Sequence, residues 1–313
     1  MAVITALGVA YVRRSFKRHQ PGRVLFVLLS ALTLILPLSA CSSGSKKSAA
    51  QDLNAPTPMT IVDANSQGVL TSNKHLSGTV FLDPGHGGVD SGTSGYTNDG
   101  TLVDEKTVVL QIALKVAAQL RADGLAVVMS RTTDDDPCIN PSDLSADGQT
   151  IVVGGVLNDL QCRIDKANAS NAKILLSLHM NAYSDPSVSG TETFYDTARP
   201  FSSKNQQFAQ LVQQNLMNAL HAQGYTTPNR GISADGDVGG ESMGTLPDSY
   251  NHLVMLGPGV PGELTPSSMP GALSEIFFLS NPSEATAVTE PSVQNVIAGA
   301  LTNAIETFLT QGG

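Results

Sequence analysis

Strand-like apolar runs alternate along this chain with stretches of helical pattern, and this alternation constrains its fold more than any other feature. Strands are predicted at residues 79–82, 125–129, 173–178, 191–195 and 271–276. Helices are predicted at residues 104–121, 163–169, 201–221 and 292–309. Parallel strands covered on both faces are almost continuously apolar and need crossover helices. The pattern therefore predicts a single α/β domain with a mostly parallel, twisted sheet of about six strands and helices on both faces.

Two long segments fit the alternation poorly. Residues 137–161 carry two cysteines and a VVGGV stretch that could form a hairpin, and residues 233–265 are rich in Gly and Pro. Long loops inside a compact domain usually have a function or move. We expect both segments to form walls or lids of an active site, in a catalytic domain at residues 77–313.

The first forty residues are predicted to be an export signal, because a basic leader precedes an uncharged apolar run at residues 24–38. That run is shorter than the roughly 20 residues that a membrane span needs. It ends in Leu38-Ser39-Ala40-Cys41, which resembles the bacterial lipoprotein box with Cys41 as the lipidated residue. Ordinary cleavage near Ala40 is the alternative. Residues 41–76 read as a flexible tether, and we expect an exported protein of the cell envelope or periplasm, either anchored to the membrane by lipid or secreted.

The charge balance excludes one class of partner. The chain has 18 basic and 27 acidic residues, and removing the leader leaves 13 against 27, a formal charge of −14. Nucleic acid binding needs a basic surface, so we expect no nucleic acid partner. A monomer is expected.

The two remaining cysteines, Cys138 and Cys162, form an even pair in an oxidising compartment, and we predict a disulfide between them. It would close a loop of about 25 residues and stabilise the fold by roughly 3 kcal/mol in the chain-entropy model. Two buried thiols are the alternative. A zinc site on these cysteines is less favoured, because neither a CxxC pair nor a nearby histidine accompanies them.

Two histidines follow predicted strands. His86 lies in the glycine-rich turn DPGHGG, and His179 lies just past the strand KILLSL. Sites in parallel sheets form outside the carboxyl ends of strands, so both imidazoles can converge. Glu105 starts a helix and Glu275 ends an apolar strand, where a carboxylate is costly to bury unless it is paired or bound to a cation.

Two histidines, a carboxylate and a water form a catalytic zinc site with one open position. A second carboxylate beside it can act as a general base. Each of these residues alone would more often be structural, and only the spacing and the glycine context favour His86 and His179 as ligands.

The motifs resemble the zinc-dependent N-acetylmuramoyl-L-alanine amidases of the amidase-3 type. The resemblance covers nearly all of residues 79–309 in the order of the family. Its blocks are VFLDPGHGGVDSG from residue 80, EKTVVLQIALKVAAQL from 105, SRTTDD from 130, RIDKANAS from 163, SLHMNA from 177, GTETFY from 190, NRGI from 229 and ALSEIFFLSNPSEA from 272.

The resemblance implies that His86, Glu105 and His179 bind Zn²⁺ and that Glu275 is the catalytic carboxylate. The implied substrate is peptidoglycan or a muropeptide, cut between N-acetylmuramic acid and L-alanine during cell-wall remodelling, cell separation or wall recycling. Asn181 is a possible contact to the substrate or to a metal ligand. Capping of a loop is an equal alternative for Asn181. Glu192 is expected to form interior hydrogen bonds near the site.

The chain also departs from the family pattern. The segment between the two cysteines is an insertion that resembles a stapled flap of mycobacterial-like members. His75, His221 and His252 are expected at the surface, His252 with the least support. Three other functions remain open: a peptidoglycan-binding regulator of the same fold, a zinc peptidase acting further along the stem, and a lipid-anchored structural protein.

Overall fold

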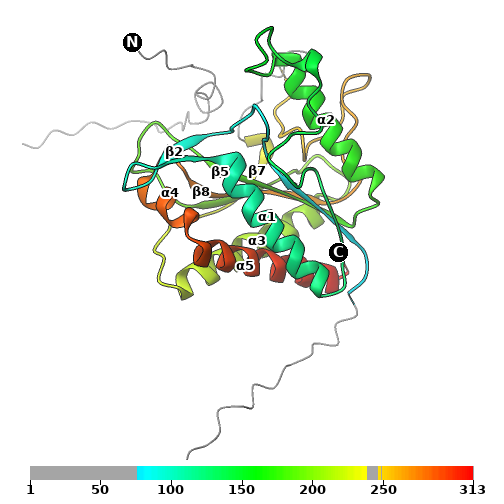
Figure 1. The fold of residues 1–313 in the computed structure, drawn as a ribbon. Helices are drawn as coiled ribbons and strands as arrows, with labels where there is room; N and C mark the ends of the chain where they lie inside the picture. The colour runs from blue at the N-terminus through cyan, green and yellow to red at the C-terminus, as the bar shows by residue number, and fades with distance from the viewer. Residues whose placement is uncertain (1–75, 238–245, 248, 313) are drawn as a thin grey trace, which may run out of the picture. The chain divides into compact units, whose positions relative to one another are not determined.

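The computed structural model describes residues 76–237, 246, 247 and 249–312 (Figure 1). The predicted export signal, Cys41, His75 and the tether up to residue 75 lie outside these ranges. None of the helices in the described ranges combines the length and the apolar character that a membrane crossing requires.

The central sheet has six strands in the order β4-β1-β5-β8-β6-β7. Their bounds are β1 Thr79–Pro84, β4 Ala126–Met129, β5 Ile174–Asn181, β6 Thr191–Tyr195, β7 Asn229–Ala234 and β8 Gly271–Phe278. Every neighbouring pair is parallel except β6 and β8, which are antiparallel. The prediction of a mostly parallel sheet of about six strands is confirmed.

Helices cover both faces of this sheet, as predicted (Figure 1). Successive side chains of a strand point to opposite faces of the sheet and pack into two separate cores. Val80 and Leu82 pack on one face, and Phe81 packs on the other. The first face is covered by α1 Glu105–Ala122, α3 Ser202–Ala222 and α5 Pro291–Thr310. The second is covered by α2 Val153–Ala169 and by apolar residues between 246 and 269.

The predicted hairpin around VVGGV is wrong. Val152 is the N-cap of α2, and the helix begins at Val153. A Cβ atom on Gly155 would lie 2.5 Å from the carbonyl oxygen of Asp143. The glycine therefore lets the start of α2 pack closely against the short helix η1 Pro141–Asp143, a tertiary requirement that the local sequence does not display.

Five more short elements were not predicted. A hairpin of β2 Ser94–Tyr96 and β3 Leu102–Asp104 precedes α1, and α4 Pro282–Thr289 follows β8. The strand β7 ends inside the segment 233–265, which fits the predicted alternation poorly, and the turn η2 Asp235–Asp237 lies within it. Each carries too few residues for a clear period.

The carboxyl ends of β1, β5 and β8 lie beside one another. Pro84 pairs with Leu178 across β1 and β5, and His179 pairs with Glu275 across β5 and β8. Glu105 begins α1 and reaches this edge from the β2–β3 hairpin. The topology therefore brings all four predicted site residues to one edge of the sheet.

Candidate active site

The three predicted ligands converge at this edge. His86 Nε2 lies 3.2 Å from Glu105 Oε1, and His179 Nδ1 lies 3.0 Å from the same oxygen. One donor atom from each residue lies within 4.8 Å of the other two. Donors around a tetrahedral zinc ion at 2.0–2.1 Å lie about 3.3 Å apart. Two imidazoles and one carboxylate at these separations can hold a metal ion.

The loop that carries His86 is held in a strained conformation. His86 has a φ of 61°, in the left-handed region that non-glycine residues rarely adopt. Arg163 donates from Nη2 to the His86 carbonyl at 2.9 Å. Arg131 donates to the carbonyls of Pro84 and Gly85 at 3.1 and 2.9 Å. The two arginines fix the backbone, so the strain at His86 persists.

The imidazole of His86 is oriented by a carboxylate. Its Nδ1 lies 2.7 Å from Asp90 Oδ2, which leaves Nε2 directed at Glu105. Burial lowers the pKa of His86, but Glu105 and Asp90 outweigh it and raise that pKa well above its usual value. A carboxylate on the far nitrogen of a histidine typically fixes the tautomer of a metal ligand.

Two glycines make room for the cluster. A Cβ atom on Gly85 would lie 2.2 Å from His179 Cε1, and one on Gly92 would lie 2.5 Å from Glu105 Oε2 and 2.6 Å from His86 Cδ2. Side-chain carbon atoms do not approach that closely. Both glycines lie in the block VFLDPGHGGVDSG, so the glycine-rich context of this block has a direct steric role.

Glu105 is 2% exposed, and both of its carboxylate oxygens accept hydrogen bonds. Its Oε1 accepts from the Met180 backbone N–H and its Oε2 from that of Thr93, both at 2.8 Å. Burial raises the pKa of Glu105, yet His86, His179 and the hydrogen bonds prevail and hold it far below the usual range. The carboxylate is therefore ionised and aimed at both imidazoles, which suits a cation.

Glu275 lies beside this cluster. It pairs in register with His179 on one side and with Glu192 on the other. Its Oε2 is buried without a hydrogen-bond partner in the described structure. Burial raises the pKa of Glu275 well above its usual value, and Glu105 raises it further while His86 opposes. A carboxyl group with a raised pKa can accept and return a proton near neutral pH.

Asn181 and Glu192 make mainly structural contacts. Asn181 Oδ1 accepts from the Ala182 N–H at 2.8 Å, a local cap at the end of β5. Glu192 accepts from Ser233 Oγ at 2.7 Å and from Arg230 Nε at 3.4 Å. Glu192 pairs in register with Glu275, so it lies next to that residue in the sheet.

The other described histidines differ from one another. His221 is exposed, with Nε2 3.1 Å from the Thr227 carbonyl oxygen. The expectation of a surface position is wrong for His252, which is partly buried between Asp196 and Asp235. Its partners follow two distant strands, so no local pattern could have paired them with it.

A cavity of about 80 Å³ adjoins the histidine pair. The first predicted wall segment contributes Val156, Asp159 and Leu160 to its lining, and the second contributes residues 253–255. His86 and His179 line the same cavity. Both segments therefore border the site, as expected, with mostly apolar side chains.

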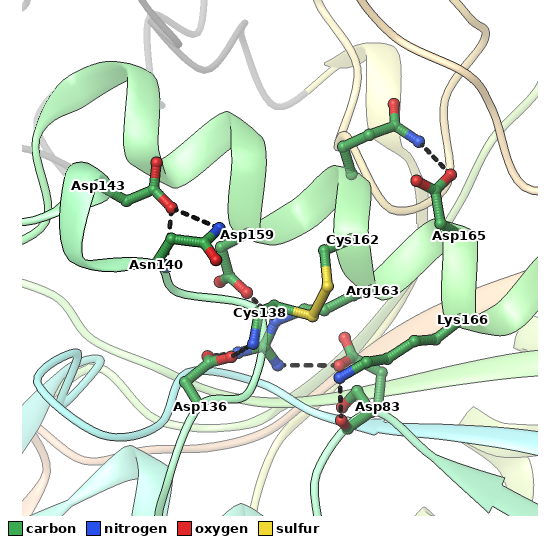
Figure 2. The surroundings of a disulfide bond; sticks show 12 residues. Asp83, Asp136, Cys138, Asn140, Asp143, Asp159, Cys162, Arg163, Asp165 and Lys166 are labelled. Atoms are coloured by element: carbon green, nitrogen blue, oxygen red, sulfur yellow. Dashed lines mark hydrogen bonds and ion pairs between the residues drawn. A yellow bond between two sulfur atoms is a disulfide. The ribbon is translucent and has the colours of Figure 1, made fainter.

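The predicted disulfide between Cys138 and Cys162 is present, with a Cα–Cα distance of 5.5 Å (Figure 2). It ties the segment before α2 to the middle of that helix. Cys162 is followed directly by Arg163, which is buried and hydrogen-bonded to the His86 carbonyl. The covalent link thus lies one residue from the group that holds the His86 loop.

Three carboxylates surround the Arg163 guanidinium (Figure 2). Its Nε donates to Asp159 at 2.7 Å, its Nη1 to Asp83 at 3.1 Å, and its Nη2 also contacts Asp136. Burial lowers the pKa of Arg163, but the carboxylates prevail and raise it. The arginine is charged and rigidly placed.

Sequence reasoning missed Asp90, Arg131 and Arg163 as parts of the site. The two arginines lie in the quoted blocks SRTTDD and RIDKANAS. A signal for Arg131 is available, because it lies two residues after the end of the apolar strand β4. Nothing in the spacing marks Asp90, since the i to i+4 relation to His86 has no meaning outside a helix.

Comparisons with known proteins identify the family of this chain. The Amidase_3 family model, described as N-acetylmuramoyl-L-alanine amidase, matches residues 80–307. A germination-specific N-acetylmuramoyl-L-alanine amidase of Bacillus subtilis (strain 168) is 31% identical over 239 residues, 76% of this chain and 83% of the relative.

Solved structures share the fold. The CwlD amidase of Clostridioides difficile, in complex with the GerS lipoprotein, is 23% identical with a TM-score of 0.56, over 75% of this chain and 99% of that one. An N-acetylmuramoyl-L-alanine amidase of Clostridium difficile 630 is 27% identical with a TM-score of 0.53, over 76% of this chain and 100% of that one. This chain therefore belongs to the N-acetylmuramoyl-L-alanine amidase family and is an enzyme of that kind.

Proposed function

We propose that this enzyme is a zinc-dependent hydrolase that cuts peptidoglycan between N-acetylmuramic acid and the L-alanine of the stem peptide. The observation that carries the proposal is the approach of His86, Glu105 and His179 to within one coordination sphere. Glu275 lies next to them in the sheet register.

The same three residues would hold the zinc ion. Two imidazoles and one carboxylate are the ligand set of an open catalytic site. When bound there, zinc lowers the pKa of water and polarises a carbonyl oxygen. His86 must bind through Nε2, because Asp90 occupies its Nδ1.

Glu275 would move the proton. Its unpartnered Oε2 accepts a proton from the attacking water as the water oxygen bonds to the scissile carbonyl carbon. The same carboxyl group then returns the proton to the alanine nitrogen as the C–N bond breaks. The products are a lactyl carboxylate on the sugar and a peptide with a free amino terminus.

We propose further that residues 77–313 are the catalytic domain of an exported envelope protein. The basic leader and apolar run support export, and the motif at Cys41 supports a lipid anchor. The segment tied by Cys138 and Cys162 supports a mycobacterial-like member of the family, with this segment as a wall of the cleft.

The test is digestion of muramyl dipeptide and of intact wall by the purified chain, with and without a chelator. We expect peptides that begin with free L-alanine, a sugar without peptide, loss of activity on chelation and recovery with Zn²⁺. Mass spectrometry of the fragments identifies the bond that is cut. Cleavage further along the stem would contradict the proposed substrate bond.

Two variants distinguish the proposed proton-transfer role of Glu275 from the proposed ligand role of Glu105. Glu275→Gln should keep its zinc and lose at least about 100-fold in kcat, the usual scale of general acid–base catalysis. Glu105→Ala should lose zinc. Equal zinc content in Glu105→Ala and wild type would remove Glu105 from the ligand set.

A further inference from the structure

A second group of potential ligands lies away from the proposed catalytic site, at the far strands of the sheet. Asp196 directly follows β6, and Asp235 directly follows β7. The two strands are parallel, and their last residues, Tyr195 and Ala234, pair in register. The backbone therefore places the two carboxylates side by side, and both residues are fully buried.

His252 completes the group from a third segment. Its Nδ1 lies 2.9 Å from Asp196 Oδ2 and 3.3 Å from Asp235 Oδ1. One donor atom from each of the three residues lies within 4.8 Å of the other two. These separations match the spacing of about 3.3 Å expected around a tetrahedral zinc ion.

Each carboxylate is oriented by its other oxygen. Asp196 Oδ1 accepts from the backbone N–H groups of Ala198 and Arg199, both at 2.8 Å. Asp235 Oδ2 accepts from the Leu253 N–H at 3.2 Å. Asp196 Oδ2, buried and turned toward the centre of the group, accepts no hydrogen bond of good geometry from the described residues, and its close polar contact among them is His252 Nδ1 at 2.9 Å. A buried carboxylate oxygen with so little compensation favours a bound cation.

We propose that Asp196, Asp235 and His252 form a second zinc site, with a structural role. Two carboxylate oxygens and one imidazole nitrogen suit Zn²⁺, whereas Ca²⁺ and Mg²⁺ prefer oxygen ligands alone. This site shares no residue with the proposed catalytic centre. The proposal goes beyond the proposed function and does not depend on it.

Such an ion would fasten a wall of the active-site cavity. His252 is followed by Leu253, Val254 and Met255, which line the cavity beside His86 and His179. The Leu253 N–H already bonds to Asp235. An ion at this position joins the ends of β6 and β7 to that wall and keeps the wall in place.

The test counts zinc in the full exported chain after saturation with Zn²⁺ and removal of the excess. We expect two equivalents in wild type, one in His179→Ala, one in Asp235→Asn, and none in the double variant. Glu263→Gln, an exposed carboxylate change in the same segment, should keep two. Anomalous diffraction at the zinc edge on wild-type crystals should locate the second ion between Asp196 and Asp235, whether or not a variant folds.

The outcomes are distinguishable. One equivalent in wild type that is lost in His179→Ala would overturn the second site and leave the proposed function intact. Two equivalents that persist in Asp235→Asn would also overturn it. A count that falls in Asp235→Asn but not in His179→Ala would support the second site and contradict the proposed catalytic ligands.

Discussion

At the scale of single residues, the candidate site depends on glycines, because a position without a side chain leaves room for the site residues. The His179 imidazole occupies the space where a side chain on Gly85 would begin. The same relation holds between Gly92 and the side chains of Glu105 and His86. These two glycines of one motif thus fix where the imidazoles and the carboxylate can meet.

This relation predicts the effect of Gly85→Ala. The new methyl group would displace the His179 ring, so we expect amidase activity to fall about 100-fold, the usual cost of a misplacement near 1 Å. Zinc content should fall with it. Gly299→Ala is the control, because that position in α5 has no atom within 4 Å of the added carbon, and it should match wild type in activity. Full activity in Gly85→Ala would contradict the ligand role of His179.

A second prediction concerns the pH dependence of stability. Burial raises the pKa of Asp159 to about 7, although Arg163 opposes the rise. An unfolded Asp titrates near 3.9. Between about pH 4 and pH 7 the folded chain therefore holds a proton that the unfolded chain has released. The free energy of unfolding should fall as pH rises through this window, by up to about 1.4 kcal/mol per pH unit from this group.

Urea unfolding of wild type and Asp159→Asn at intervals from pH 4 to pH 8 measures this contribution. The variant should lose stability less steeply with rising pH than wild type, because its amide does not titrate. Asp165→Asn, an exposed position on the same helix, should follow wild type. Parallel curves for wild type and Asp159→Asn would contradict the raised pKa.

At the scale of elements, α2 links the second core to the active site. It packs Leu157, Ile164 and Ala167 against the sheet and presents Val156 and Leu160 to the cavity. Cys162 binds it covalently to the segment before it. The position of this helix therefore decides the position of one cavity wall.

The disulfide should contribute measurably to stability. Cys138→Ser with Cys162→Ser should lower the free energy of unfolding by about 3 kcal/mol, since the bond closes a loop with a sequence separation of 24. Denaturant unfolding with and without reductant measures it. Reductant should destabilise wild type and leave the double variant unchanged. A double variant as stable as oxidised wild type would exclude this role.

At the scale of the whole molecule, the described domain carries two separate cores, one on each face of the sheet. Both consist of residues within 76–312. The sheet also carries the proposed catalytic residues and the proposed second zinc site on its strand ends. A self-sufficient domain of this kind should fold without the predicted signal and tether.

A chain reduced to residues 77–313 tests this domain boundary. We expect one cooperative thermal transition within about 2 °C of the mature chain, because the described members of both cores lie after residue 75. Its kcat on muramyl dipeptide should also be unchanged. Loss of the transition would mean that residues before 77 belong to the folded domain.

The sequence by itself determined the order and type of the long elements, because burial on both faces makes parallel strands continuously apolar and one-sided packing gives helices their period. It failed where the determining contacts were distant, as at the start of α2, where Gly155 packs against Asp143. Short elements such as β2 and β3 carried too little pattern to be seen.

For the candidate site, His86, His179, Glu105 and Glu275 could be named from strand ends, glycines and motif resemblance. Only the tertiary structure decided that Arg131 and Arg163 clamp the His86 loop and that His252 lies between Asp196 and Asp235. These contacts join residues tens of positions apart. Their energy depends on burial and on the pairing of charges, which exist only after the chain has folded.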